Sequence, residues 1–232
     1  MTDQLLENFD DGVATLTMNR PEARNAMTGE MMAALNDAVQ RLALDPEVRC
    51  VVLTGAGNAF CAGGDVKGQA KAATERASGG TFSIEQRVQG LRSGMETSRL
   101  LHEMPKPTLA VIPGAVAGAG LSLALACDLR VAAAEAKFTT AFAKVGASGD
   151  YGGSYFLPRL VGGAKARELY FTADIISGQQ AFELGLVNHA FPGAELEVEA
   201  QAFARKLASL PTVAIGLSLI HISEPTRPFT LS

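Results

Sequence analysis

The sequence contains few of the residues that build disulfide-rich, metal-binding or nucleic-acid-binding proteins. Its 232 residues include no tryptophan, three histidines and three cysteines, with a net charge of −4 and a pI near 5.5. A nucleic-acid-binding domain is usually basic, with a pI above about 9. We therefore expect no nucleic-acid partner, and an anionic ligand would have to be bound by local groups.

The three cysteines, Cys50, Cys61 and Cys127, are far apart and form no C-x-x-C pair. This spacing encodes neither a disulfide framework nor a zinc site, so we predict no metal site and reduced thiols that pack as small apolar side chains. The first residues, MTDQLLENFDDG, are acidic and lack an apolar core, so they do not form a secretory signal. Reduced thiols and the absence of such a signal predict a cytoplasmic protein.

One uncharged stretch, residues 108–127, is about as long as a membrane span. Pro113, Gly114, Gly118 and Gly120 interrupt it. A buried strand, a glycine-rich turn and a buried helix explain it better than a membrane helix does, so we predict no membrane partner.

Elsewhere, strand and helix patterns alternate. Residues 12–18, 50–54, 108–112 and 129–132 are rich in β-forming residues and predict strands. Thr28 is a candidate N-cap for a helix whose apolar residues repeat at helical spacing until Asp45-Pro46. The alternation predicts an α/β fold with one principal domain, and residues 70–83 predict a surface excursion.

Two of these strands lead into glycine-rich loops. Gly118-Ala119-Gly120 precedes an apolar helix, whose first N–H groups have no partner within the helix and can bind an anion or an oxyanion. A phosphate-binding loop would need a lysine there, a dinucleotide loop would need glycine in place of Leu123, and a nucleophile elbow would need glycine in place of Ala124. The alternative is close packing of a helix against a sheet.

The other loop follows the predicted strand at 50–54 and contains Gly63-Gly64, directly after the segment AFCA at 59–62. Adjacent glycines allow a main-chain N–H to face a ligand without a Cβ in the way. One N–H from each of the two loops would suffice for an oxyanion hole that binds an acyl carbonyl.

Four ordered motifs resemble those of the crotonase (enoyl-CoA hydratase/isomerase) superfamily. They are NRPEARNAM (19–27), AFCAGGDVK (59–67), PGAVAGAGLSLALACD (113–128) and AFELGLVN (181–188). The resemblance covers roughly residues 5–216. It implies a crotonase-like spiral of ββα repeats over residues 1–190, followed at 191–216 by the start of a C-terminal helical region. It also implies an acyl-CoA thioester substrate, no cofactor besides the coenzyme A of that substrate, and a homotrimer or dimer of trimers when full length.

The resemblance also implies a set of site residues. Gly64 and Ala119 would donate the two oxyanion-hole hydrogen bonds, and Ala119, which replaces the usual glycine, needs a negative φ. Arg24 and Lys67 would lie near the nucleotide phosphates, although both could simply be solvated surface charges. The remaining expected substrate contacts are Ala26, Ala62, Asp65, Val66 and Gly118.

A single acidic residue, Asp150, stands in the loop GASGDYGGS at 146–154. Hydratases of the superfamily use two glutamates, and Ser122 and Phe142 occupy the corresponding positions here, which disfavours ordinary hydration. Asp150 instead matches the single aspartate of several double-bond isomerases of the superfamily, where one carboxylate suffices for a 1,3-proton shift. The alternative role for Asp150 is a turn or helix cap.

The sequence therefore predicts an enoyl-CoA isomerase in which Asp150 transfers the proton. A hydratase or another crotonase reaction, and a non-catalytic CoA-thioester binder, remain alternatives. Residues 217–227, LSLIHISEPTR, resemble a translated sequencing adapter, so we expect residues 217–232 to be a non-native tail.

Overall fold

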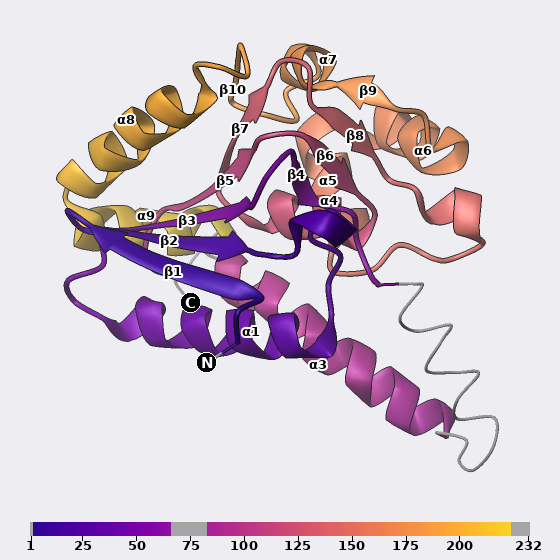
Figure 1. The fold of residues 1–232 in the computed structure, drawn as a ribbon, viewed down its shortest axis with the longest axis horizontal. Helices are drawn as coiled ribbons and strands as arrows, with labels where there is room; N and C mark the ends of the chain where they lie inside the picture. The colour runs from indigo at the N-terminus through magenta and orange to yellow at the C-terminus, as the bar shows by residue number, and fades with distance from the viewer. Residues whose placement is uncertain (1, 66–82, 224–232) are drawn as a thin grey trace, which may run out of the picture.

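A computed structural model describes residues 2–65 and 83–223 of the chain (Figure 1). Its larger sheet has the strand order β1-β2-β3-β5-β7-β10, in which β1 is antiparallel to β2 and all other pairs are parallel. These strands are β1 (Leu5–Asp10), β2 (Val13–Met18), β3 (Cys50–Gly55), β5 (Thr108–Ile112), β7 (Leu129–Ala133) and β10 (His189–Phe191). The four strands predicted from sequence are confirmed.

A smaller sheet contains β4 (Ala59–Cys61), β6 (Ala115–Ala117), β8 (Lys137–Thr139) and β9 (Ile176–Ser177). Strands β4, β6 and β8 are parallel, and β9 closes the sheet antiparallel to β8. Each of β3, β5 and β7 in the larger sheet is thus followed in sequence by a strand of the smaller sheet, and then by a helix. This repetition is the ββα spiral that we expected.

Helix α1 (Gly29–Leu44) begins where the sequence predicts, because the Thr28 side chain accepts a hydrogen bond of 3.1 Å from the Met31 N–H. Its apolar face packs toward the larger sheet, and α3 (Ile84–His102) lies beside it. Helix α8 (Leu196–Ser209) covers the opposite face of the same sheet (Figure 1). Apart from the C-terminal helix described below, the other helical segments of the described residues are η1 (Pro21–Ala23), α4 (Ala119–Ala126), η2 (Phe142–Val145), α5 (Gly153–Val161), α6 (Gly163–Thr172) and α7 (Gly178–Glu183).

The uncharged stretch at 108–127 forms β5, the short strand β6 and α4, so it is the strand, turn and helix that we predicted, with one additional strand in the turn. Over the part of the chain that the structure describes, none of the helices combines the length and the apolar character needed to cross a bilayer. The predicted surface excursion at 70–83 falls, apart from Ser83, outside the described residues.

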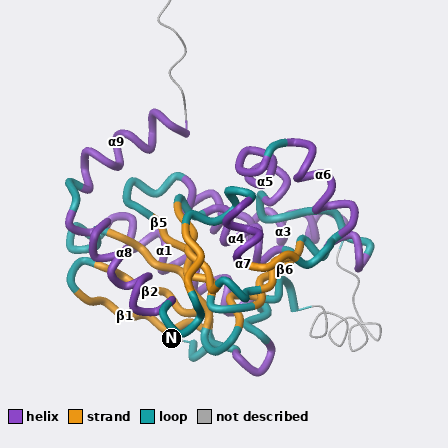
Figure 2. The backbone as a smooth tube through the Cα atoms, turned by 90° about the horizontal axis from the view of Figure 1, so that it is seen from above, coloured by secondary structure: helices purple, strands orange, loops and turns teal. Residues whose placement is uncertain are grey.

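Helix α9 (Thr212–Ser223) projects from the body of the molecule (Figure 2). It runs without interruption through Leu217, where we expected the non-native tail to begin. The backbone therefore has no structural boundary at that residue.

Candidate active site

A cavity of about 700 Å³ lies at the carboxyl ends of three parallel strands of the smaller sheet. Residues within two positions of the ends of β4, β6 and β8 contribute to it, as expected for a ligand site in a sheet of this kind. The beginning of α1 forms another wall. The described lining residues are Met27, Thr28, Gly29, Met32, Ala33, Asn36, Asp37, Ala62, Gly63, Gly64, Gly94, Gly118, Ala119, Ala141, Phe142, Val145, Ala147, Asp150 and Tyr151.

The two glycine-rich loops converge in this cavity. A Cβ placed on Gly63 would lie 3.0 Å from the Ala117 carbonyl oxygen and 3.5 Å from the Ala119 nitrogen, so a side chain there would fill the gap between the loops. Gly63 has a φ of +91°, which glycine adopts readily. The absent side chain of Gly63 therefore lets the two loops approach each other beside Gly64, the donor predicted from the sequence, which also lines the cavity.

The main-chain N–H groups of both loops are suited to bind an oxygen atom. Ala119 is the first residue of α4 and is not in the left-handed region, so its backbone meets the condition set by the sequence. Its N–H belongs to the first helical turn, where no carbonyl of the helix can accept it. In the other loop, the Met27 N–H donates to the Gly63 carbonyl, and the Asp65 N–H donates to the Met27 carbonyl. In this parallel pairing, Gly64 lies between the two bonded residues, so its own N–H points away from Met27.

Asp150 lines the same cavity as Gly64 and Ala119. One of its carboxylate oxygens, Oδ1, is buried and has no hydrogen-bond partner. Burial raises the pKa of the Asp150 carboxyl above its ordinary value, and a hydrogen bond from its own main-chain N–H lowers it by less. The next helix, α5, is capped by Gly152 without a side-chain hydrogen bond, so Asp150 does not act as its N-cap.

The positions where hydratases of the superfamily carry glutamates hold no carboxylate. Ser122 is buried in α4, and its hydroxyl donates a hydrogen bond of 3.3 Å to the Gly118 carbonyl. Phe142 lines the cavity and stacks on Tyr170 with ring centres 6.1 Å apart. Asp150 and Asp37 are therefore the acidic side chains among the described residues of the cavity wall, and Asp37 lies on α1.

The predicted substrate-binding residues divide into two groups. Ala62 and Gly118 line the cavity. Arg24 is exposed, and its main-chain carbonyl accepts a hydrogen bond from the Ala62 N–H. Ala26 is buried, and Asp65 forms a 3.1 Å ion pair with Arg20. None of these three predicted contacts is among the described residues of the cavity wall. Val66 and Lys67 lie outside the described residues.

The three cysteines are buried and free, as predicted, and none belongs to the cavity wall. Burial raises the pKa of each thiol to about 12. A thiol with such a pKa stays protonated near neutral pH and is a poor nucleophile. The described residues contain no group of three or more histidine, cysteine, aspartate or glutamate side chains placed to bind a metal ion.

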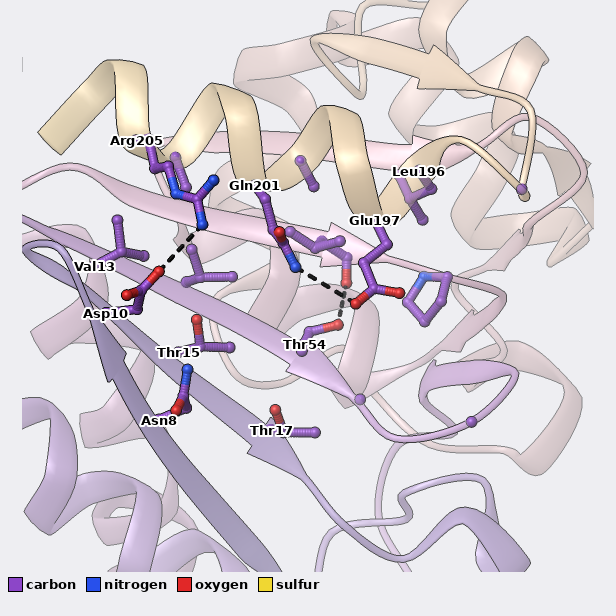
Figure 3. A pocket seen from close by; sticks show the side chains of 18 residues that line it. Asn8, Asp10, Val13, Thr15, Thr17, Thr54, Leu196, Glu197, Gln201 and Arg205 are labelled. Atoms are coloured by element: carbon purple, nitrogen blue, oxygen red, sulfur yellow. Dashed lines mark hydrogen bonds and ion pairs between the residues drawn. The ribbon is translucent and has the colours of Figure 1, made fainter. Parts of the chain in front are cut away.

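A second cavity, of about 480 Å³, separates the larger sheet from α8 (Figure 3). Threonines of β2 and β3 face polar side chains of α8 across it. Its charged groups already have partners, since Arg205 pairs with Asp10 at 3.1 Å and Gln201 donates to Glu197 at 3.4 Å. No residue expected to act on a substrate lines this second cavity, so we assign the candidate site to the first.

Comparison with known proteins identifies the family. The sequence model described as "Enoyl-CoA hydratase/isomerase" matches residues 8–221. The chain belongs to the enoyl-CoA hydratase/isomerase family. It is 38% identical over 217 residues to a 1,2-epoxyphenylacetyl-CoA isomerase of Escherichia coli (strain K12), a match that covers 94% of this chain and 80% of that one. It is 35% identical over 216 residues to a crotonyl-CoA hydratase of Syntrophomonas wolfei, covering 93% and 79% of the two chains.

Solved structures of enoyl-CoA hydratase/isomerase family members have the same fold. The crystal structure of an enoyl-CoA hydratase from Polaromonas sp. JS666 has a TM-score of 0.86 and 36% sequence identity, covering 95% of this chain and 83% of that one. The family expectation drawn from four sequence motifs is thus confirmed, and the chain is an enzyme of a family that acts on CoA thioesters.

Two parts of the site were not predicted from the sequence. One is the wall formed by α1 at Met32, Ala33 and Asn36, which appeared only as helical periodicity. The other is Tyr151, which lines the cavity in a left-handed conformation, with a φ of +50°. A tyrosine directly between an aspartate and two glycines is the one signal that could have indicated an unusual backbone there.

Proposed function

We propose that this enzyme moves a carbon–carbon double bond in an enoyl-CoA thioester, with Asp150 as the group that carries the proton. The observation that carries the proposal is a buried, unpartnered carboxylate oxygen of Asp150 in the cavity where the loops of Gly64 and Ala119 converge. The 1,2-epoxyphenylacetyl-CoA isomerase among the relatives supports an isomerisation, whereas the crotonyl-CoA hydratase is a precedent for water addition.

The proposed reaction begins when the thioester carbonyl oxygen accepts hydrogen bonds from the N–H groups of Gly64 and Ala119. The Asp150 carboxylate then removes a proton from C2 of a 3-enoyl-CoA, and the electron pair of that C–H bond delocalises into a dienolate whose negative charge falls on the carbonyl oxygen. Two main-chain donors stabilise this charge, and each is worth about 2.7–4 kcal/mol of barrier lowering. Return of the same proton to C4 yields the 2-enoyl-CoA without net consumption of acid or base.

The environment of Asp150 suits a base that must also return its proton. A raised pKa makes the carboxylate more basic, and it makes the neutral carboxyl accessible after proton transfer. Ser122 and Phe142 offer no second carboxylate to activate water, which is the specific reason to favour isomerisation over hydration. A homotrimeric or larger assembly remains a prediction from the family resemblance.

The test compares turnover of a 3-enoyl-CoA with water addition to crotonyl-CoA, for the parent enzyme and for Asp150→Asn. We expect isomerisation by the parent enzyme and a loss of about 10²- to 10⁴-fold in the variant, the usual contribution of a general base. Asp174→Asn, which neutralises an exposed aspartate that does not line the cavity, is the matched control and should keep full activity.

Two outcomes would contradict the proposal. Efficient hydration of crotonyl-CoA without isomerisation of the 3-enoyl-CoA would make the enzyme a hydratase. Tight binding of acetoacetyl-CoA by calorimetry, with no turnover of either substrate, would make it a non-catalytic binder.

A further inference from the structure

Tyr151, the residue after the proposed base, has a constrained backbone. Its φ is +50°, and Gly152 follows with a φ of +82°. A left-handed conformation costs a non-glycine residue about 1–3 kcal/mol, and it persists where surrounding contacts hold it. These two residues reverse the chain between Asp150 and α5, which places the Tyr151 side chain in the same cavity wall as the carboxylate.

The Tyr151 ring reaches across to helix α3. A Cβ on Gly94 would lie 2.6 Å from the Tyr151 hydroxyl oxygen and 3.4 Å from the adjoining ring carbon, so the hydroxyl stands directly against the Gly94 main chain. Gly94 also lines the cavity. The missing side chain at residue 94 therefore creates the space that the end of the tyrosine occupies.

The ring is held there by packing. Tyr151 is partly buried against the hydrophobic core, and burial raises the pKa of its phenol to about 12. The neighbouring Asp150 contributes to this rise in pKa, since a negative charge disfavours the phenolate. The phenol thus stays neutral, and its most direct influence on a ligand is steric.

We infer that Tyr151 is a specificity-determining residue that, together with Gly94, closes one end of the acyl cavity and restricts the enzyme to short or compact acyl groups. The inference deepens the proposed function, because it concerns the acyl group that Asp150 would act upon. An aromatic ring wedged between the loop of Asp150 and a helix leaves a fixed volume beside the base, and a well-packed wall does not move cheaply. A longer chain would have to displace the ring.

The experiment measures kcat/KM for 3-hexenoyl-CoA and 3-decenoyl-CoA with the parent enzyme, Tyr151→Ala and Tyr155→Ala. Tyr155, on α5, does not line this cavity and provides the matched loss of an aromatic ring. We expect the C10:C6 ratio of kcat/KM to rise at least about tenfold in Tyr151→Ala, the lower end of what one methylene contributes in an apolar pocket. It should stay unchanged in Tyr155→Ala, and an unchanged ratio in Tyr151→Ala would overturn the inference.

A second pair of variants tests the contact itself. Gly94→Ala should force the hydroxyl of Tyr151 to move and alter the C10:C6 ratio, and adding Tyr151→Phe should restore it, because the phenyl ring lacks the oxygen that lies 2.6 Å from the new methyl group. If Phe fails to rescue the Ala variant, Tyr151 does not set the cavity depth through Gly94.

Binding separates this inference from the proposed reaction. Calorimetry with saturated hexanoyl-CoA and decanoyl-CoA requires no turnover, so it reports on the wall even if the enzyme does not isomerise either 3-enoyl-CoA. Stronger binding of decanoyl-CoA relative to hexanoyl-CoA in Tyr151→Ala would support the inference under either outcome. An unchanged relative affinity would refute it, and a variant of Tyr151 that does not fold would leave Gly94→Ala to decide.

Discussion

The substitution Gly63→Ala tests whether the two glycine-rich loops act together on a substrate carbonyl. The new Cβ would lie 3.0 Å from the Ala117 carbonyl oxygen and 3.5 Å from the Ala119 nitrogen. The first distance is shorter than ordinary van der Waals contact, so the loops must separate by a few tenths of an ångström. Gly63 also has a φ of +91°, where an alanine adds strain of about 1–3 kcal/mol.

The expected functional loss is larger than the loss of stability explains. Removing one oxyanion-hole donor typically lowers kcat by about 10²- to 10³-fold. Since charge accumulates on the carbonyl oxygen only as the proton leaves, we expect kcat to fall far more than KM rises. The assay is steady-state isomerisation of 3-hexenoyl-CoA, accompanied by urea unfolding of each variant.

Gly185→Ala is the matched control for backbone strain. Gly185 has a φ of +74°, a Cβ there would meet nothing closer than 3.9 Å, and the residue does not line the cavity. It should lose comparable conformational stability and keep its kcat. If both variants retain activity to the same degree, the loops do not form an oxyanion hole and the proposed reaction loses its electrostatic basis.

Three further outcomes can be checked independently. Gly120→Ala would place a Cβ 2.5 Å from the Cys61 carbonyl oxygen inside the core, so we expect about 1–3 kcal/mol of destabilisation in urea unfolding. Lys106→Met should cost about 1.5–3 kcal/mol by the same measurement, because the buried ammonium donates to two main-chain carbonyls at the C-terminal end of α1. In the pH profile of isomerisation, kcat/KM should fall as the pH drops through the raised pKa of Asp150, at a higher pH than an ordinary aspartate would give.

Local signals in the sequence predicted the parts of the fold that local physics determines. The Thr28 cap, the four strands and the uncharged segment at 108–127 all formed where the residue patterns indicated. The glycine-rich loops were also identified correctly as neighbours of strand ends. Each of these features depends on residues within one turn or one strand, so a single stretch of sequence carries the information.

The geometry of the site depends on residues that are far apart in the chain. The separation between Gly63 and Ala119 follows from the pairing of β4 with β6, and no local pattern specifies it. The contact between Tyr151 and Gly94 joins a loop to a helix, and it depends on Gly94 having no side chain. A single glycine of this kind does not change the hydrophobic periodicity of the sequence. The family motifs supplied part of this information, and they covered the two loops but not α1 or α3.

The two roles considered for Asp150 make opposite predictions about stability. A carboxylate that caps a helix stabilises the fold, and replacing it with alanine costs about 0.5–2 kcal/mol. A buried Asp150 carboxylate without a hydrogen-bond partner on Oδ1 has the reverse effect, because its pKa in the folded state is above the value in the unfolded state. The stability that this group contributes is present at low pH and is lost as the pH rises through the folded-state pKa.

Asp150→Ala should therefore leave the free energy of unfolding at pH 7 unchanged or increased, while Thr28→Ala, which removes an observed cap, should lower it. The comparison of urea unfolding at pH 7 and at pH 4 also shows the sign, since the benefit of Asp150→Ala must shrink as the carboxyl becomes protonated. If Asp150→Ala is inactive but more stable, Asp150 lowers the free energy of unfolding in the parent enzyme and is required for the reaction, as expected of an active-site residue. A loss like that of Thr28→Ala would instead assign Asp150 to the architecture of its loop and remove the proposed base.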